Sequence, residues 1–316
     1  MVIFSLTGSV AYTMGVVLSI LVFASLVCGF MKSRMAQDSY EELKQRIKSW
    51  WVIIGLLFVV LLSGTTLSII FFAFLSFLAL KEFLSIVPMR PVDRKVIFWA
   101  YLSIPLQYYW VSIEWYGMFI VFIPVYVFLF LPMRMVLTGD TKGFIRSAGV
   151  VHWACMLTVF SISHIAYLLV LPGSHNESNN EYEALGLVLF LLFMTQFNDV
   201  GQYVWGKLFG RHKIIPKVSP NKTWEGFIGG VATVTVCSAI IAPLLTPLNY
   251  YQGAFAGLLL ASSGFVGDVV ISSVKRDLQI KDSGSLIPGH GGILDRMDSL
   301  TYTSPLFFHF IYYVSY

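Results

Sequence analysis

The chain has 316 residues, of which 57% are hydrophobic and 12% are charged, and its formal net charge is +4. A typical soluble domain has about 25% charged residues, and a soluble surface of this size needs more charge than this chain supplies. The composition therefore excludes a soluble enzyme, a secreted disulfide scaffold, a disordered chain and a collagen-like fibre, and it predicts a protein with several membrane spans.

Ten apolar runs along the chain have lengths near the ~20 residues that a helix needs to cross a bilayer. The period-2 alternation of an outer-membrane barrel is absent. We therefore predict an all-α, polytopic integral membrane protein with nine or ten transmembrane helices, because the second and the last runs are short. The runs, in chain order, are 8–30, 47–63, 66–87, 96–112, 117–133, 149–171, 184–205, 225–247, 252–271 and 300–316.

Loops rich in lysine and arginine alternate with loops that have neither residue. Twenty of the 21 basic residues fall in every second loop, and the intervening loops have none. Positively charged loops stay on the cytoplasmic side of a membrane, so we expect a multi-pass protein of the bacterial inner (cytoplasmic) membrane. The basic loops are 31–48, 88–95, 134–146, 206–223 and 272–296.

Unusual polar residues are concentrated in the last third of the chain. We expect residues 1–95 to form an N-terminal transmembrane scaffold and residues 96–172 to form middle helices that are a candidate dimer interface. Residues 173–316 would be the catalytic transmembrane region. We find no internal repeat, so an inverted-repeat transporter is not favoured.

Carboxylates stand at membrane depth in this region, where each costs several kcal/mol unless it is paired, hydrated or metal-bound. Asp268, Ser272 and Lys275 share one stripe of a helix, and Asp295 and Asp298 share a face of the next one. Asp199 lies near the inner end of an earlier run. Carboxylates and hydroxyls that converge suit a hard cation such as Mg²⁺.

Five basic residues gather at the same level as the carboxylates, and glycines at 289, 291 and 292 precede a helix start. Backbone amides at such a start bind anions. This combination is typical of Mg²⁺-assisted phosphoryl or nucleotidyl transfer. The basic residues are Lys222, Lys275, Arg276, Lys281 and Arg296.

The stretch 272–298 reads SSVKRDLQIKDSGSLIPGHGGILDRMD. It resembles, without a departure, the signature of the phosphatidate cytidylyltransferases (CDP-diacylglycerol synthases). The segment 219–226 resembles the family's Ser-Pro-Lys-Lys-Thr-Trp-Glu-Gly, with Asn221 in place of the first lysine. Gln202 stands where the family commonly has a small residue. These two departures indicate a divergent branch or paralogue.

The resemblance implies that the protein transfers a cytidylyl group from CTP to phosphatidic acid in phospholipid biosynthesis, giving CDP-diacylglycerol and pyrophosphate. It implies an integral membrane homodimer that depends on Mg²⁺, with a monovalent cation such as K⁺ able to join the metal site. Phosphatidic acid would enter from the inner leaflet and meet CTP from the cytoplasm, and no nucleic acid would bind.

The resemblance and the polar pattern together predict the site residues. The expected catalytic residues are Asp268, Lys275, Asp295 and Asp298, and the three aspartates among them are the expected metal ligands. The expected substrate-binding residues are Asp199, Lys222, Ser272, Arg276, Lys281, His290, Gly291, Gly292 and Arg296.

Three alternatives stay open at this point. A CTP-dependent enzyme could act on another lipid phosphate or on a polyprenol. A membrane transporter would also keep carboxylates at depth, although it would leave the Gly-His-Gly-Gly segment unexplained. A catalytically silent homologue would bind a partner.

Overall fold

The computed structural model describes residues 2–31, 37–172, 181–286 and 291–316, and every extended element in these ranges is helical. The all-α prediction is confirmed. An isolated antiparallel bridge pairs Lys213 with Thr223. The helices are α1 (Val2–Met31), α2 (Gln37–Leu62), α3 (Thr65–Ile86), η1 (Pro91–Asp93), α4 (Arg94–Ser112), α5 (Tyr116–Val121), η2 (Phe122–Val127), α6 (Phe128–Val136), α7 (Phe144–Cys155), η3 (Met156–Phe160), α8 (Ser161–Leu168), α10 (Glu181–Phe209), α11 (Trp224–Leu245), α12 (Tyr250–Asp277), α13 (Leu294–Met297) and α14 (Leu300–Ser315).

Eight helices among the described residues are long and apolar enough to cross a membrane. Two of them are continuous through a π-helical segment, η2 between α5 and α6 and η3 between α7 and α8. The remaining predicted runs, 96–112 and 300–316, are also helical, as α4 and α14, but α14 has only 16 residues. The chain is a multi-pass membrane protein, and the expected count of nine or ten spans is approximate.

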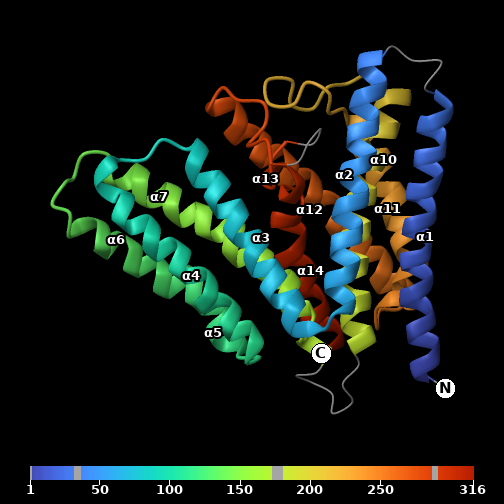
Figure 1. Cartoon of the computed structure of the whole chain (residues 1–316), viewed down its shortest axis with the longest axis horizontal. Helices are drawn as coiled ribbons and strands as arrows, with labels where there is room; N and C mark the ends of the chain where they lie inside the picture. Colours follow the sequence, from blue (N-terminus) through green and yellow to red (C-terminus); the bar gives the residue numbers. More distant parts are fainter. Residues whose placement is uncertain (1, 32–36, 173–180, 287–290) are drawn as a thin grey trace.

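Two groups of helices make up the molecule. In Figure 1, α1, α2, α10, α11, α12 and α14 stand in one group, and α4 to α7 slant away on the other side of α3. The start of α1 and the end of α14 lie at one end of the molecule, whereas α13 lies toward the opposite end. Since α10 packs against both α11 and α12, these three helices position the polar residues of the last third of the chain.

Helices α10 and α11 approach each other closely because glycines face the contact. A Cβ added to Gly230 would lie 2.5 Å from Gln202 Cγ, and one added to Gly226 would lie 2.8 Å from the Gln202 carbonyl oxygen. Small residues permit such close backbone packing in membranes. The contact brings Gln202 next to the loop that ends at Lys222.

An ion pair joins the segment between α3 and α4 to the start of α7. Arg90 Nε and Nη2 donate to Asp93 Oδ2 and Oδ1 at 2.6 and 2.8 Å, and Ser147 Oγ donates to Asp93 Oδ2 at 2.5 Å. Arg90 Nη1 donates to the carbonyl oxygens of Asp140 and Lys142. Burial acts to raise the pKa of Asp93, but the hydrogen bonds from Arg90 and Ser147 outweigh it and hold that pKa below its usual value.

Candidate active site

Asp268 lies on α12 and is held by a hydroxyl and an ammonium group. Ser272 Oγ, one turn further along α12, donates to Asp268 Oδ1 at 3.2 Å. Lys222 Nζ lies 2.6 Å from Asp268 Oδ2 and also 3.2 Å from Gln202 Oε1. The predicted stripe of Asp268 and Ser272 is therefore present, and the loop before α11 adds a lysine to it.

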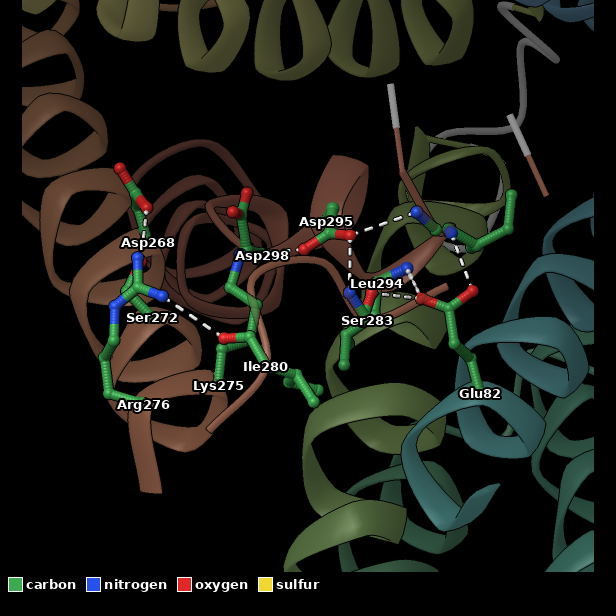
Figure 2. Close-up of polar contacts among 12 residues, drawn as sticks. Glu82, Asp268, Ser272, Lys275, Arg276, Ile280, Ser283, Leu294, Asp295 and Asp298 are labelled. Carbon is green, nitrogen blue, oxygen red and sulfur yellow. Dashed lines mark hydrogen bonds and ion pairs between the residues drawn. The ribbon is translucent and has the colours of Figure 1, made fainter. Parts of the chain in front are cut away.

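Asp295 in α13 receives three hydrogen bonds that occupy both of its oxygens. Lys275 Nζ donates to Oδ1 at 2.7 Å, and the backbone amides of Ser283 and Gly292 donate to Oδ2 at 2.8 and 3.0 Å. Burial acts to raise the pKa of Asp295, but Lys275 and the amides outweigh it and lower that pKa. The Asp295 carboxylate thus holds the backbone at Ser283 and Gly292, and it also forms an ion pair with Lys275 of α12 (Figure 2).

Asp298 stands close to two other carboxylates. A Cβ on Gly267 would lie 2.5 Å from the Asp298 carbonyl oxygen, so the glycine lets α12 approach the start of α14. Burial and the negative charges of Asp268 and Asp199 raise the pKa of Asp298 well above its usual value. Ser299 bridges the group, since its amide donates to Asp298 Oδ1 and its hydroxyl donates to Asp199.

Glu82 on α3 is a site residue that the sequence did not reveal. Its Oε2 accepts the Ile293 amide at 2.9 Å, its Oε1 accepts the Leu294 amide at 3.0 Å, and Ser283 Oγ donates to it (Figure 2). We expected no chemical constellation in residues 1–172. The one available signal was a carboxylate inside an apolar run, which is costly unless it has a partner.

The glycines of the predicted phosphate loop give room to these two carboxylates. Gly291 has φ +79°, a conformation that favours glycine, and its Cβ would lie 2.6 Å from Asp295 Oδ2. A Cβ on Gly292 would overlap Glu82. The amides of residues 292 to 294 donate to Asp295 and Glu82, so protein carboxylates hold the helix start at which we expected phosphate.

Four other predicted site residues remain, of which the structure describes Arg276, Lys281 and Arg296. Arg276 is exposed and donates to the carbonyl oxygens of Val218 and Ile280, so it joins two loops. Lys281 is exposed. Arg296 is half-buried, and its Nε has no hydrogen-bond partner among the described residues. His290 lies outside the described residues.

The donor atoms of the cluster match the preference of Mg²⁺ for oxygen ligands. The ammonium groups of Lys222 and Lys275 form ion pairs with Asp268 and Asp295. The site therefore holds positive charge next to each of these two carboxylates. Within the described ranges, however, no three Asp, Glu, His or Cys side chains are placed as a ready metal-ion site. The residue types fit the ion, whereas in the described arrangement Asp268 and Asp295 form ion pairs with lysine side chains.

Comparison with known proteins places the chain in a family. Residues 44–314 match the cytidylyltransferase family. The Uncharacterized protein YnbB of Escherichia coli (strain K12) is 45% identical over 298 residues, 94% of this chain and 97% of that protein. The Phosphatidate cytidylyltransferase of Staphylococcus haemolyticus (strain JCSC1435) is 30% identical over 269 residues, 83% of this chain and 96% of that protein.

A third relative matches a shorter part of the chain. The Phosphatidate cytidylyltransferase of Haemophilus influenzae (strain ATCC 51907 / DSM 11121 / KW20 / Rd) is 38% identical over 166 residues, which is 50% of this chain and 57% of that protein. The family match includes the whole carboxylate and lysine cluster, from Glu82 to Asp298. The chain is therefore a multi-pass membrane protein of the cytidylyltransferase family.

Proposed function

We propose that this protein is a phosphatidate cytidylyltransferase, which converts CTP and phosphatidic acid to CDP-diacylglycerol and pyrophosphate in phospholipid biosynthesis. The observation that carries the proposal is the cluster of Asp199, Asp268 and Asp298 beside two lysine ammonium groups. Asp199 and Asp268 lie within the membrane-spanning helices α10 and α12, and Asp298 lies just before α14. Such a cluster suits a reaction between a water-soluble nucleotide and a lipid phosphate.

The identity of the lipid is supported by the relatives. Two of those named above are phosphatidate cytidylyltransferases, and the stretch 272–298 has the full signature of those enzymes. The uncharacterised relative YnbB and the departures at Gln202 and Asn221 are consistent with a divergent paralogue.

The proposed reaction needs no strong base. A phosphate oxygen of phosphatidic acid attacks the α-phosphorus of CTP, the bond between that phosphorus and the bridging oxygen to the β-phosphate breaks, and pyrophosphate leaves with the electron pair. The lipid phosphate is already deprotonated near neutral pH. Positioning and charge neutralisation are then the main contributions of the protein.

Each charged group has a task in this scheme. Lys222 and Lys275 neutralise the triphosphate, and Arg276 keeps the neighbouring loops in place through its two carbonyl contacts. Asp268, Asp295 and Asp298 would hold Mg²⁺, and a monovalent cation such as K⁺ would be the second cation of the site. When bound, the Mg²⁺ would neutralise phosphate charge and orient the leaving pyrophosphate.

The basic loops support an orientation for the site. The positive-inside rule puts them on the cytoplasmic side of the inner membrane, so CTP would arrive from the cytoplasm and phosphatidic acid from the inner leaflet. A homodimer is part of the same proposal.

The test is turnover by purified protein in detergent with CTP, phosphatidic acid and Mg²⁺, with CDP-diacylglycerol followed by mass spectrometry. We expect product that disappears with a chelator and in Asp268→Asn and Asp295→Asn. The matched control is Asp277→Asn, since Asp277 is an exposed carboxylate at the end of α12.

The outcomes separate the alternatives. Product from a polyprenyl phosphate or from another lipid phosphate, and none from phosphatidic acid, would move the substrate to a different lipid. Ion flux across vesicle membranes that does not require CTP would indicate that the protein is a transporter and not an enzyme. Full activity of Asp268→Asn would remove the proposed site.

A further inference from the structure

A large apolar cavity lies beside the carboxylate cluster and is not used by the chemistry described above. Its volume is about 690 Å³. Helices α1, α2, α3 and α10 supply most of its wall, through side chains such as Met14, Leu57, Leu75 and Leu189. Empty space of this size in an apolar wall would cost packing energy if it stayed unfilled, so the cavity calls for an apolar occupant.

One part of the cavity wall is positively charged. Lys48 of α2 and Arg296 of α13 both line the cavity. Lys48 has no ion-pair partner among the described residues, and the buried Nε of Arg296 likewise has no hydrogen-bond partner there. Because a buried donor without an acceptor is costly, Arg296 favours a ligand that brings an acceptor.

Arg296 also connects the cavity with the carboxylate cluster. It belongs to α13, whose Ile293 cap and Met297 line the cavity, while Asp295 of the same short helix pairs with Lys275 on α12. A ligand phosphate at Arg296 would therefore stand at the border between the cavity and the reacting groups.

We propose that this cavity binds an acyl chain of the lipid phosphate that accepts the cytidylyl group, with the lipid phosphate at Arg296 and Lys48. The inference rests on the proposed function and specifies where its lipid substrate lies. An apolar wall with two cations on it complements an anionic amphiphile, whereas a neutral lipid would bring no negative charge to either cation.

The length of the cavity suits a chain rather than a compact ligand. Its wall on α2 extends from Gln45 to Phe58, and thirteen residues of α helix rise by about 20 Å. The chain would run from the level of α13 toward the other end of α2, along the Phe72 and Leu75 side of α3. Long acyl chains should then bind better than short ones.

The experiment measures the KM for phosphatidic acids of increasing acyl length, from dihexanoyl to dipalmitoyl, in mixed micelles. In the wild type we expect KM to fall as the chain lengthens. Leu57→Trp, which fills the cavity, should raise the KM for the dipalmitoyl lipid roughly tenfold or more. The KM values for CTP and for the dihexanoyl lipid should not change.

The matched control is Val59→Trp. Val59 is on the same helix, is 63% exposed and does not line the cavity, so its variant should behave like the wild type. An unchanged dipalmitoyl KM in a folded, monodisperse Leu57→Trp protein would overturn the proposal. An equal effect of Val59→Trp would overturn it as well.

A second measurement uses the wild-type protein and does not depend on turnover. A phosphatidic acid with a photoreactive group near the end of an acyl chain should label peptides of α2, α3 and α10, and unlabelled phosphatidic acid should compete. Labelling confined to other helices, or equal competition by phosphatidylglycerol, would overturn the proposal. Absence of any turnover with specific labelling would contradict the proposed function and leave the lipid site in place.

Discussion

Gln202 Oε1 accepts a hydrogen bond from Lys222 Nζ at 3.2 Å, and the same ammonium lies 2.6 Å from Asp268. The Gln202 amide nitrogen donates to Asn198 Oδ1 at 3.0 Å, and Asn198 donates to the carbonyl oxygen of Ala261. A buried chain of polar groups thus runs from α12 through α10 to the lysine. Gln202 stands where the family resemblance leads us to expect a small residue, and its side chain helps to orient Lys222 through this hydrogen bond.

Gln202→Ala should lower kcat/KM for CTP. The variant removes an acceptor from a charged donor, an interaction worth about 1.5 kcal/mol at the lower end, which corresponds to roughly tenfold. Steady-state kinetics with CTP as the varied substrate provides the measurement. Gln202→Met keeps the length without the acceptor and should behave like the alanine variant, whereas restored activity in Gln202→Met would mean that volume matters and the hydrogen bond does not.

Glu82→Ala should lower both thermal stability and activity. It leaves the amides of Ile293 and Leu294 without their acceptor, and an unsatisfied buried polar group costs about 1–3 kcal/mol. Thermal unfolding in detergent and turnover are the two readouts. Lys81→Ala changes the exposed neighbour and should match the wild type, while a wild-type melting temperature for Glu82→Ala would contradict the role of Glu82.

Gly292→Ala should damage the same contact from the other side. The added methyl group would overlap the Glu82 carboxylate, so either the loop or α3 must shift. We expect a loss of activity of at least roughly tenfold, as overpacking costs about 1–3 kcal/mol. Gly149→Ala on α7 is the control because nothing lies within 4 Å of its added Cβ. Equal activities of the two variants would argue against a tight loop.

Asp298→Asn should make the protein more stable near neutral pH and less active. The pKa of Asp298 is raised by burial and by Asp268 and Asp199, so its ionised form opposes folding at any pH above the unfolded-state value of about 3.9. An uncharged side chain removes that cost. A higher melting temperature together with lost turnover is the expected pair of results, and a lower melting temperature would show that the charge is compensated.

The Arg90–Asp93 pair should contribute a pH-dependent part of stability. Since the pKa of Asp93 is lowered in the folded protein, the contribution is complete above the unfolded-state pKa of about 3.9 and is lost as pH falls through the folded-state pKa. Asp93→Asn should therefore lower the melting temperature near neutral pH, and its difference from the wild type should shrink below about pH 4. A difference that stays constant with pH would contradict the ion-pair explanation.

The sequence by itself determined the features that depend on local spacing. Apolar runs of bilayer length predict the helices, since a membrane span must satisfy its backbone internally. The contact of Ser272 with Asp268 follows from their separation of one helical turn. The alternation of basic loops and the 27-residue signature can also be recognised from the sequence, because neither depends on how the helices pack.

Which distant groups meet depends on how the helices pack against one another. Lys275 pairs with Asp295 and not with Asp268 on its own helix face, and Glu82 reaches the start of α13 from α3. Glu82 is a single glutamate in an apolar run, so no periodic pattern reveals its role. The group with which a charged side chain pairs depends on which helices pack against each other. Helix packing depends on the combined fit of many side chains from different helices. The spacing of residues along one segment carries no information about that fit.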